Sequence, residues 1–133
     1  MIPPWFADVL ARYARVAIVG GPGTGKSTLA SYVDDRPVLG TDGYTDVPWA
    51  MIPRAVINAV SELGPRWCIE GCQVARCLRK GLRPDVVVVL RTPRRPLTDA
   101  QATFGKGVMT ILAEVRGSGL TFIEPQALSH INR

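Results

Sequence analysis

The chain has 133 residues, of which 47% are hydrophobic and 20% are charged, and its formal net charge is +5. This length predicts one domain with a single core, and the ordinary globular composition argues against a low-complexity or disordered chain. The longest apolar run, residues 86–90, is far shorter than the roughly 20 residues that span a bilayer, and the N-terminus lacks a basic and apolar signal segment. We therefore expect a cytoplasmic protein with no membrane partner.

Strands and helices are expected to alternate along the chain. An amphipathic helix is predicted before residue 15, because Trp5, Val9 and Leu10 recur at helical spacing. After it, short apolar runs that suit buried strands are separated by segments with helical periodicity. This alternation predicts an α/β fold in which helices cover both faces of a parallel sheet. The expected strands are 15–19, 37–40, 67–70, 85–90 and 120–123, and the later helices are 28–33, 49–63, 73–80 and 98–116, the last with Thr98 as its N-cap.

The first expected strand runs into a complete GxxxxGK[ST] motif, Gly20–Ser27. Glycines let the backbone turn tightly and point successive N–H groups inward, which suits the phosphates of a nucleotide. Lys26 is expected to reach the β- and γ-phosphates, and the Ser27 hydroxyl to bind Mg²⁺. The alternative, a glycine-rich turn with a chance GKS, is disfavoured by the flanking strand and helix. The residues expected to bind ATP are Gly20, Gly21, Pro22, Gly23, Thr24, Gly25, Lys26, Ser27 and Thr28.

Two acidic residues follow expected strands, at the sheet edge where open α/β proteins bind ligands. Asp42 lies in a polar loop and is favoured as the base that orients or deprotonates an attacking hydroxyl; its alternative role is an Asx turn. Glu70 ends an apolar strand, where an unpaired charge is costly, and is expected to hold Mg²⁺ or to assist the base. Tyr44 and Trp49 are expected near the acceptor, where each either stacks on a base or packs in the core.

Arginines concentrate in the second half of the chain. Arg91 and Arg95 lie in the connection after the fourth expected strand, where a guanidinium can pair with phosphate oxygens during transfer. Residues 76–106 hold eight basic residues against Asp85 and Asp99, a net charge of +6. Such a segment either attracts a polyanion or serves ATP alone, and both interpretations stay open. The residues expected to contact nucleic acid are Arg76, Arg79, Lys80, Arg83, Arg94 and Lys106.

The cysteines and the single histidine predict no metal chemistry. Cys68, Cys72 and Cys77 have neither a CxxC spacing nor a nearby histidine, so core thiols are expected in place of a zinc site or a disulfide framework. His130 is expected at the surface.

Residues 15–124 resemble the P-loop kinases of the nucleoside and nucleotide kinase group, in the segments GGPGTGKST, TDGY, CIEG and RTPRR. The resemblance implies a P-loop NTPase-type three-layer sandwich whose five parallel strands have the order 2-3-1-4-5, with Mg-ATP as the phosphate donor. It also implies an acidic residue near the acceptor hydroxyl, which corresponds to Asp42, and lid arginines, which correspond to Arg91 and Arg95.

Within that group, IEGCQ and the stretch 101–107 most resemble the small phage-encoded kinases that phosphorylate 5-hydroxymethyluracil in DNA. The resemblance implies a DNA partner that carries a hydroxymethylated base, which would suit the basic segment, although no DNA-binding motif is visible. A kinase of a free nucleoside, nucleotide or other small alcohol is the second interpretation. A nucleotide-binding switch or ATPase is the third, disfavoured by the arginine loop and by the lack of an NKxD motif.

Overall fold

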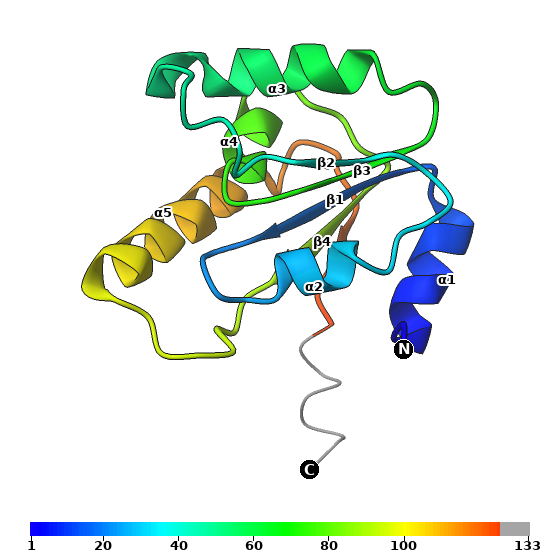
Figure 1. The fold of residues 1–133 in the computed structure, drawn as a ribbon, viewed down its shortest axis with the longest axis horizontal. Helices are drawn as coiled ribbons and strands as arrows, with labels where there is room; N and C mark the ends of the chain where they lie inside the picture. Colours follow the sequence, from blue (N-terminus) through cyan, green and yellow to red (C-terminus); the bar gives the residue numbers. More distant parts are fainter. Residues whose placement is uncertain (126–133) are drawn as a thin grey trace.

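A computed structural model describes residues 1–125 and contains one parallel five-stranded sheet (Figure 1). The strands are β1 (Arg15–Gly20), β2 (Val38–Gly40), β3 (Trp67–Glu70), β4 (Val86–Leu90) and β5 (Phe122–Ile123). Their order across the sheet is β2-β3-β1-β4-β5, and every neighbouring pair is parallel. This confirms the expected α/β class and strand order. His130 lies outside the described residues.

Helices cover both faces of the sheet. They are α1 (Pro4–Arg12), α2 (Lys26–Ala30), α3 (Ile52–Ser61), α4 (Val74–Arg79) and α5 (Asp99–Val115). Alternate side chains of β1 point to opposite faces, as a pleated strand requires. Ala17 and Val19 pack with α3, α4 and α5, whereas Val16 and Ile18 pack with α1 and α2. In residues 1–125, no helix is long and apolar enough to cross a membrane.

Local chemistry explains where the helices begin and end. Thr98 caps α5 with a reciprocal pair of hydrogen bonds to Gln101, as the sequence predicted for the N-cap. The expected helix 49–63 starts as a 3₁₀ turn, Trp49–Met51, before α3. Helix α2 begins two residues earlier and ends earlier than expected, and the chain continues to Val33 in tighter turns.

Helix α1 is fixed to the rest of the molecule by Arg36, whose side chain is fully buried. The Arg36 guanidinium donates to the backbone carbonyls of Leu10, Tyr13 and Ala14, at the C-terminal end of α1. These carbonyls have no partners within the helix, so a buried cation suits them. The contact matters for the site because α1 carries Trp5, which lines one of its pockets.

Candidate active site

The residues expected to carry the chemistry meet at the carboxyl edge of the sheet. Gly20–Ser27, called here the glycine-rich loop, follows β1, and Asp42 follows β2. Glu70 is the last residue of β3, and Arg91 is the first residue after β4. Parallel strands bring these positions together although they lie far apart in sequence.

The glycine-rich loop adopts a conformation that depends on its glycines. Gly23 and Gly25 have φ angles of +74° and +94°, in the region that other residues rarely adopt. A side chain on Gly21 would come within 2.9 Å of the Gly105 Cα, so the loop approaches α5 closely. Lys26 is buried at 6% exposure, and its Nζ donates to the Gly21 carbonyl at 2.7 Å. The lysine is therefore folded against the loop that it is expected to serve.

Three pockets lie side by side at this edge because they share lining residues. The first, called here the loop pocket, has a volume of about 340 Å³ and lies against the glycine-rich loop. The second, the aromatic pocket, has about 680 Å³ and includes Tyr44, Trp49 and Phe104. The third, the Trp5 pocket, has about 410 Å³ and includes Trp5 and Tyr32.

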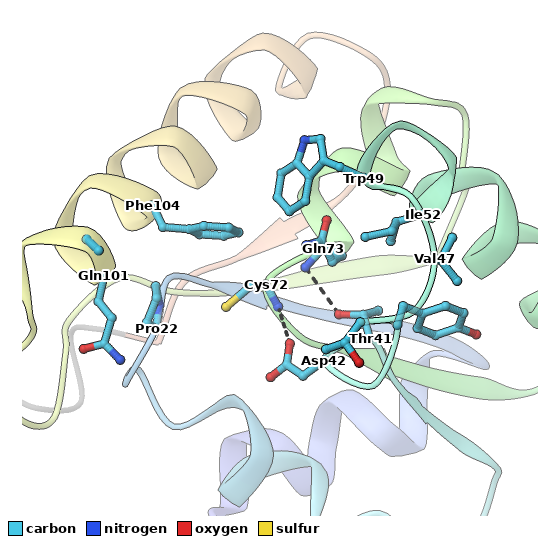
Figure 2. A pocket seen from close by; sticks show the side chains of 13 residues that line it. Pro22, Thr41, Asp42, Val47, Trp49, Ile52, Cys72, Gln73, Gln101 and Phe104 are labelled. Carbon is cyan, nitrogen blue, oxygen red and sulfur yellow. Dashed lines mark hydrogen bonds between the residues drawn. The ribbon is translucent and has the colours of Figure 1, made fainter.

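Asp42 lines both the loop pocket and the aromatic pocket. Its carboxylate is oriented by the Cys72 backbone N–H, which donates to Asp42 Oδ1 at 3.3 Å (Figure 2). The neighbouring Thr41 Oγ1 accepts from the Gln73 backbone N–H at the same distance, 3.3 Å. These two bonds tie the loop after β2 to the turn before α4. Asp42 therefore lies where the loop pocket and the aromatic pocket meet, and its carboxylate can contact a group bound in either pocket.

Glu70 has a different environment. It is about half buried, and its Oε1 is a fully enclosed side-chain atom without a hydrogen-bond partner in residues 1–125. Burial raises the pKa of Glu70, the nearby charge of Asp42 raises it further, and Lys26 opposes both. An enclosed carboxylate oxygen with no partner is suited to a cation such as Mg²⁺, which prefers oxygen ligands. In the described chain, no group of three or more His, Cys, Asp or Glu side chains could hold a metal by itself.

The aromatic pocket has an apolar wall and a polar floor (Figure 2). Trp49 and Phe104 form an edge-to-face pair with ring centroids 6.1 Å apart, so they make one continuous surface from the 3₁₀ turn to α5. Thr41, Asp42 and Gln73 lie below them. Such a pocket suits a flat ring that carries polar substituents.

The arginines of the loop after β4 are arranged differently from the expectation. Arg95 lines the loop pocket, and Arg94 also lies against the loop, with its Nη1 3.0 Å from the position of a Cβ on Gly25. Arg91 instead forms an ion pair with Glu124, which also binds Arg116. Both arginines hold the pKa of Glu124 below its usual range. Arg91 is thus held by Glu124 in this structure, and the two guanidinium groups beside the glycine-rich loop are those of Arg95 and Arg94.

Several of the basic residues expected to contact nucleic acid make contacts within the molecule. Arg76 packs over Trp49, and Arg79 pairs with Glu114 at 3.8 Å. Arg83 donates to the Ser118 carbonyl. Lys80 lies in a groove against α3, and Lys106 lines a pocket with Arg91 and Gly21, against the glycine-rich loop. Their charges add up along the sequence, but local contacts on different elements engage several of them.

The cysteines divide into two groups. Cys68 and Cys77 are buried in the two core clusters, as expected, and burial raises the pKa of each thiol to about 12. Cys72 is instead half-buried and lines both the loop pocket and the aromatic pocket. The expectation of a core thiol was wrong for this residue, because the turn between β3 and α4 leads its side chain to the site.

Sequence reasoning missed several residues that line the pockets, above all Trp5, Tyr32, Gln73, Gln101 and Phe104. Their patterns resemble those of ordinary helical residues. Gln73 lies in the segment IEGCQ, and Gln101 and Phe104 lie in the stretch 101–107, so the resemblance marked these segments without giving the three residues a role. The chain matches no protein-family model, no curated protein and no solved structure.

Proposed function

We propose that the protein is a P-loop kinase that transfers the γ-phosphate of ATP to a hydroxyl group. The observation that carries this proposal is the position of Asp42, which lines both the loop pocket and the aromatic pocket. A kinase needs a carboxylate at the junction of donor and acceptor, because the attacking hydroxyl must be oriented and must lose its proton. A switch or simple ATPase has no need of a second, aromatic pocket beyond that carboxylate.

In this proposal ATP lies across two of the pockets. Its phosphates bind the backbone of the glycine-rich loop, and Lys26 leaves the Gly21 carbonyl to contact the β- and γ-phosphates. The adenosine occupies the Trp5 pocket, which shares Gly25 and Thr28 with the loop pocket and offers Trp5 and Tyr32 for stacking.

Ser27 and Glu70 would hold Mg²⁺, which when bound neutralises charge on the phosphate oxygens. The enclosed Glu70 Oε1, which has no partner in the described chain, supports this assignment. Arg95 and Arg94, which lie against Gly23 and Gly25 of the loop, add guanidinium donors for the phosphates. Arg91 remains a candidate that must first leave Glu124. Asp42 accepts the proton of the acceptor hydroxyl as the oxygen–phosphorus bond forms, and ADP leaves.

The acceptor in the leading form of the proposal is the hydroxymethyl group of 5-hydroxymethyluracil in DNA. The aromatic pocket supports a base as the acceptor, since its wall is Trp49 and Phe104, and Trp49 is 56% exposed at the rim. A base in a duplex must leave the stack to reach Asp42, at a cost of a few kcal/mol that backbone contacts can offset.

A free nucleoside or nucleotide is the second candidate acceptor. The observation that favours it is the engagement of Arg76, Arg79 and Arg83 in contacts within the molecule, which leaves fewer cations for a DNA backbone.

One labelling experiment tests the function and separates the two acceptors. The protein is incubated with γ-labelled ATP and Mg²⁺, together with duplex DNA containing 5-hydroxymethyluracil, unmodified duplex, or free hydroxymethylated nucleosides. Label in the modified duplex alone supports the DNA form, and label in the nucleosides supports the second. For a DNA acceptor, affinity should also fall with salt, with a log–log slope of about −0.9 per phosphate neutralised. Absence of label in every acceptor, from a folded protein that binds ATP, contradicts the kinase proposal.

A further inference from the structure

Arg76 holds two parts of the aromatic pocket at once. Its guanidinium carbon lies 4.1 Å from the centre of the Trp49 ring, and its Nη2 donates to the Trp49 carbonyl at 2.9 Å. Its Nη1 donates to Gln73 Oε1, also at 2.9 Å. The arginine therefore fixes the aromatic wall and a polar side chain of the same pocket, a use that differs from the expected contact with a polyanion.

This contact decides which way the Gln73 amide faces. A guanidinium has only donors, so the amide oxygen must point toward Arg76, and the reverse orientation would set two donors against each other. Gln73 is only 9% exposed, and its backbone N–H is held by Thr41. The amide can therefore turn only at the cost of a buried hydrogen bond.

The Gln73 Nε2 group is consequently available to a ligand. It donates no hydrogen bond within residues 1–125. In that part of the chain, Glu70 Oε1 is the one side-chain atom that is both fully enclosed and without a partner. Gln73 Nε2 is therefore not fully enclosed and keeps some contact with solvent. Gln73 lines the aromatic pocket together with Trp49 and Phe104. The pocket thus offers an aromatic surface and, beside it, a fixed hydrogen-bond donor.

We propose that Gln73 is the specificity-determining residue of the aromatic pocket and that Arg76 is its positioning residue. The Gln73 amide donates to a ring carbonyl of the acceptor, so the site selects an oxo-substituted pyrimidine over its amino-substituted counterpart. An amino group at that position would face the Nε2 donor and leave both groups without a partner. The inference rests on the proposed function for the identity of the pocket as an acceptor site, but it makes a separate claim about ring recognition.

The test compares two acceptors that differ in this substituent, 5-hydroxymethyluracil and 5-hydroxymethylcytosine. Each is offered as the free 2′-deoxynucleoside and within the same short oligonucleotide. Affinity is measured by calorimetry in the presence of a non-hydrolysable ATP analogue, and kcat/KM is measured with ATP. The wild-type protein should prefer the uracil ring by about tenfold in affinity, the discrimination that one satisfied hydrogen bond supplies.

Two variants examine the two roles. Gln73→Glu is nearly isosteric but presents an acceptor to the ring, so the preference should shift to cytosine. Arg76→Met keeps an apolar stem beneath Trp49 but frees the Gln73 amide to turn. The preference for the uracil ring should then disappear, because the KM values for the two rings become equal, and the two kcat values should also be similar. Arg12→Met is the matched control, because Arg12 forms an exposed ion pair with Asp8 on α1, and it should retain the wild-type preference.

Equal affinity of the wild-type protein for both rings, or an unchanged preference in Gln73→Glu, overturns the inference. If the protein binds the two rings with different affinities but transfers no phosphate, the role of Gln73 in ring recognition is supported and only the proposed kinase activity is contradicted. Transfer to both rings at equal efficiency supports the kinase and overturns the role of Gln73.

Discussion

Replacement of Gly71 by alanine tests how the turn between β3 and α4 supports the site. Gly71 has a φ angle of +132°, and a Cβ there would lie 1.9 Å from Thr41 Oγ1 and 3.1 Å from Asp42 Oδ1. These two oxygens accept the backbone hydrogen bonds from Gln73 and Cys72. We expect the substitution to push the loop after β2 away from the turn and to displace the Asp42 carboxylate.

The magnitude follows from a comparison with Gly81→Ala. Gly81 also has a positive φ, +108°, but a Cβ there would meet nothing within 4 Å. Backbone strain alone should therefore cost the Gly81 variant about 1–2 kcal/mol of unfolding free energy. Gly71→Ala bears similar strain and loses both hydrogen bonds at about 1 kcal/mol each, for a total of roughly 3–4 kcal/mol.

Urea unfolding of both variants measures the difference, and the transfer assay measures its consequence. Gly71→Ala should lose most transfer activity under conditions in which it remains folded, whereas Gly81→Ala should retain it. Equal unfolding free energies for the two variants, or full activity in Gly71→Ala, would refute the idea that this close approach holds Asp42 in place.

Three further predictions concern charged residues of the site. Lys26→Met should abolish transfer with little change in the unfolding transition followed by circular dichroism; near wild-type turnover in the folded variant would remove Lys26 from the mechanism. Burial raises the pKa of Glu70 above its ordinary value of 4.5, so ionisation of this carboxyl opposes folding. The unfolding free energy of Glu70→Gln relative to wild type should therefore increase as the pH rises through 4.5 and above. Urea titrations without ATP or Mg²⁺ measure this difference. A pH-independent difference would argue against a destabilised carboxylate. Arg95→Ala should lower kcat, whereas Arg91→Ala should mainly lower the unfolding temperature because Glu124 loses a partner. Steady-state kinetics and thermal unfolding measure the two effects. The reverse pattern would indicate that Arg91, and not Arg95, contacts the phosphates.

Several features of the fold could be predicted because local sequence and global packing agree. The apolar runs of β1, β3 and β4 have a length and composition that suit buried parallel strands. Thr98 followed by Gln101 forms a capping box that marks the start of α5. The glycine-rich loop has its own sequence signature, so its position at the carboxyl edge of the sheet followed from the strand before it.

The details of the site could not be predicted in the same way. Arg91 and Arg94 are chemically alike, and only the path of the loop decides that Glu124 pairs with one while the other lies against Gly25. The contribution of Trp5 depends on how α1 docks, which is a tertiary contact between distant segments. Arg76 belongs to a segment with a high positive charge, but its packing over the Trp49 ring gives it a local role. Charge counted along a sequence does not report which charges remain free.

The most direct test of the account is to measure ATP affinity and phosphate transfer for Asp42→Asn with the same protein sample. The amide keeps the shape of the side chain and can still accept a hydrogen bond from the Cys72 N–H, but it cannot take the proton of the acceptor. We predict unchanged ATP affinity and transfer that is slower by about 10²-fold or more, the usual contribution of a positioned general base. Transfer at the wild-type rate, or a loss of ATP affinity that accounts for the whole defect, would contradict the claim that Asp42 joins the phosphate donor to its acceptor.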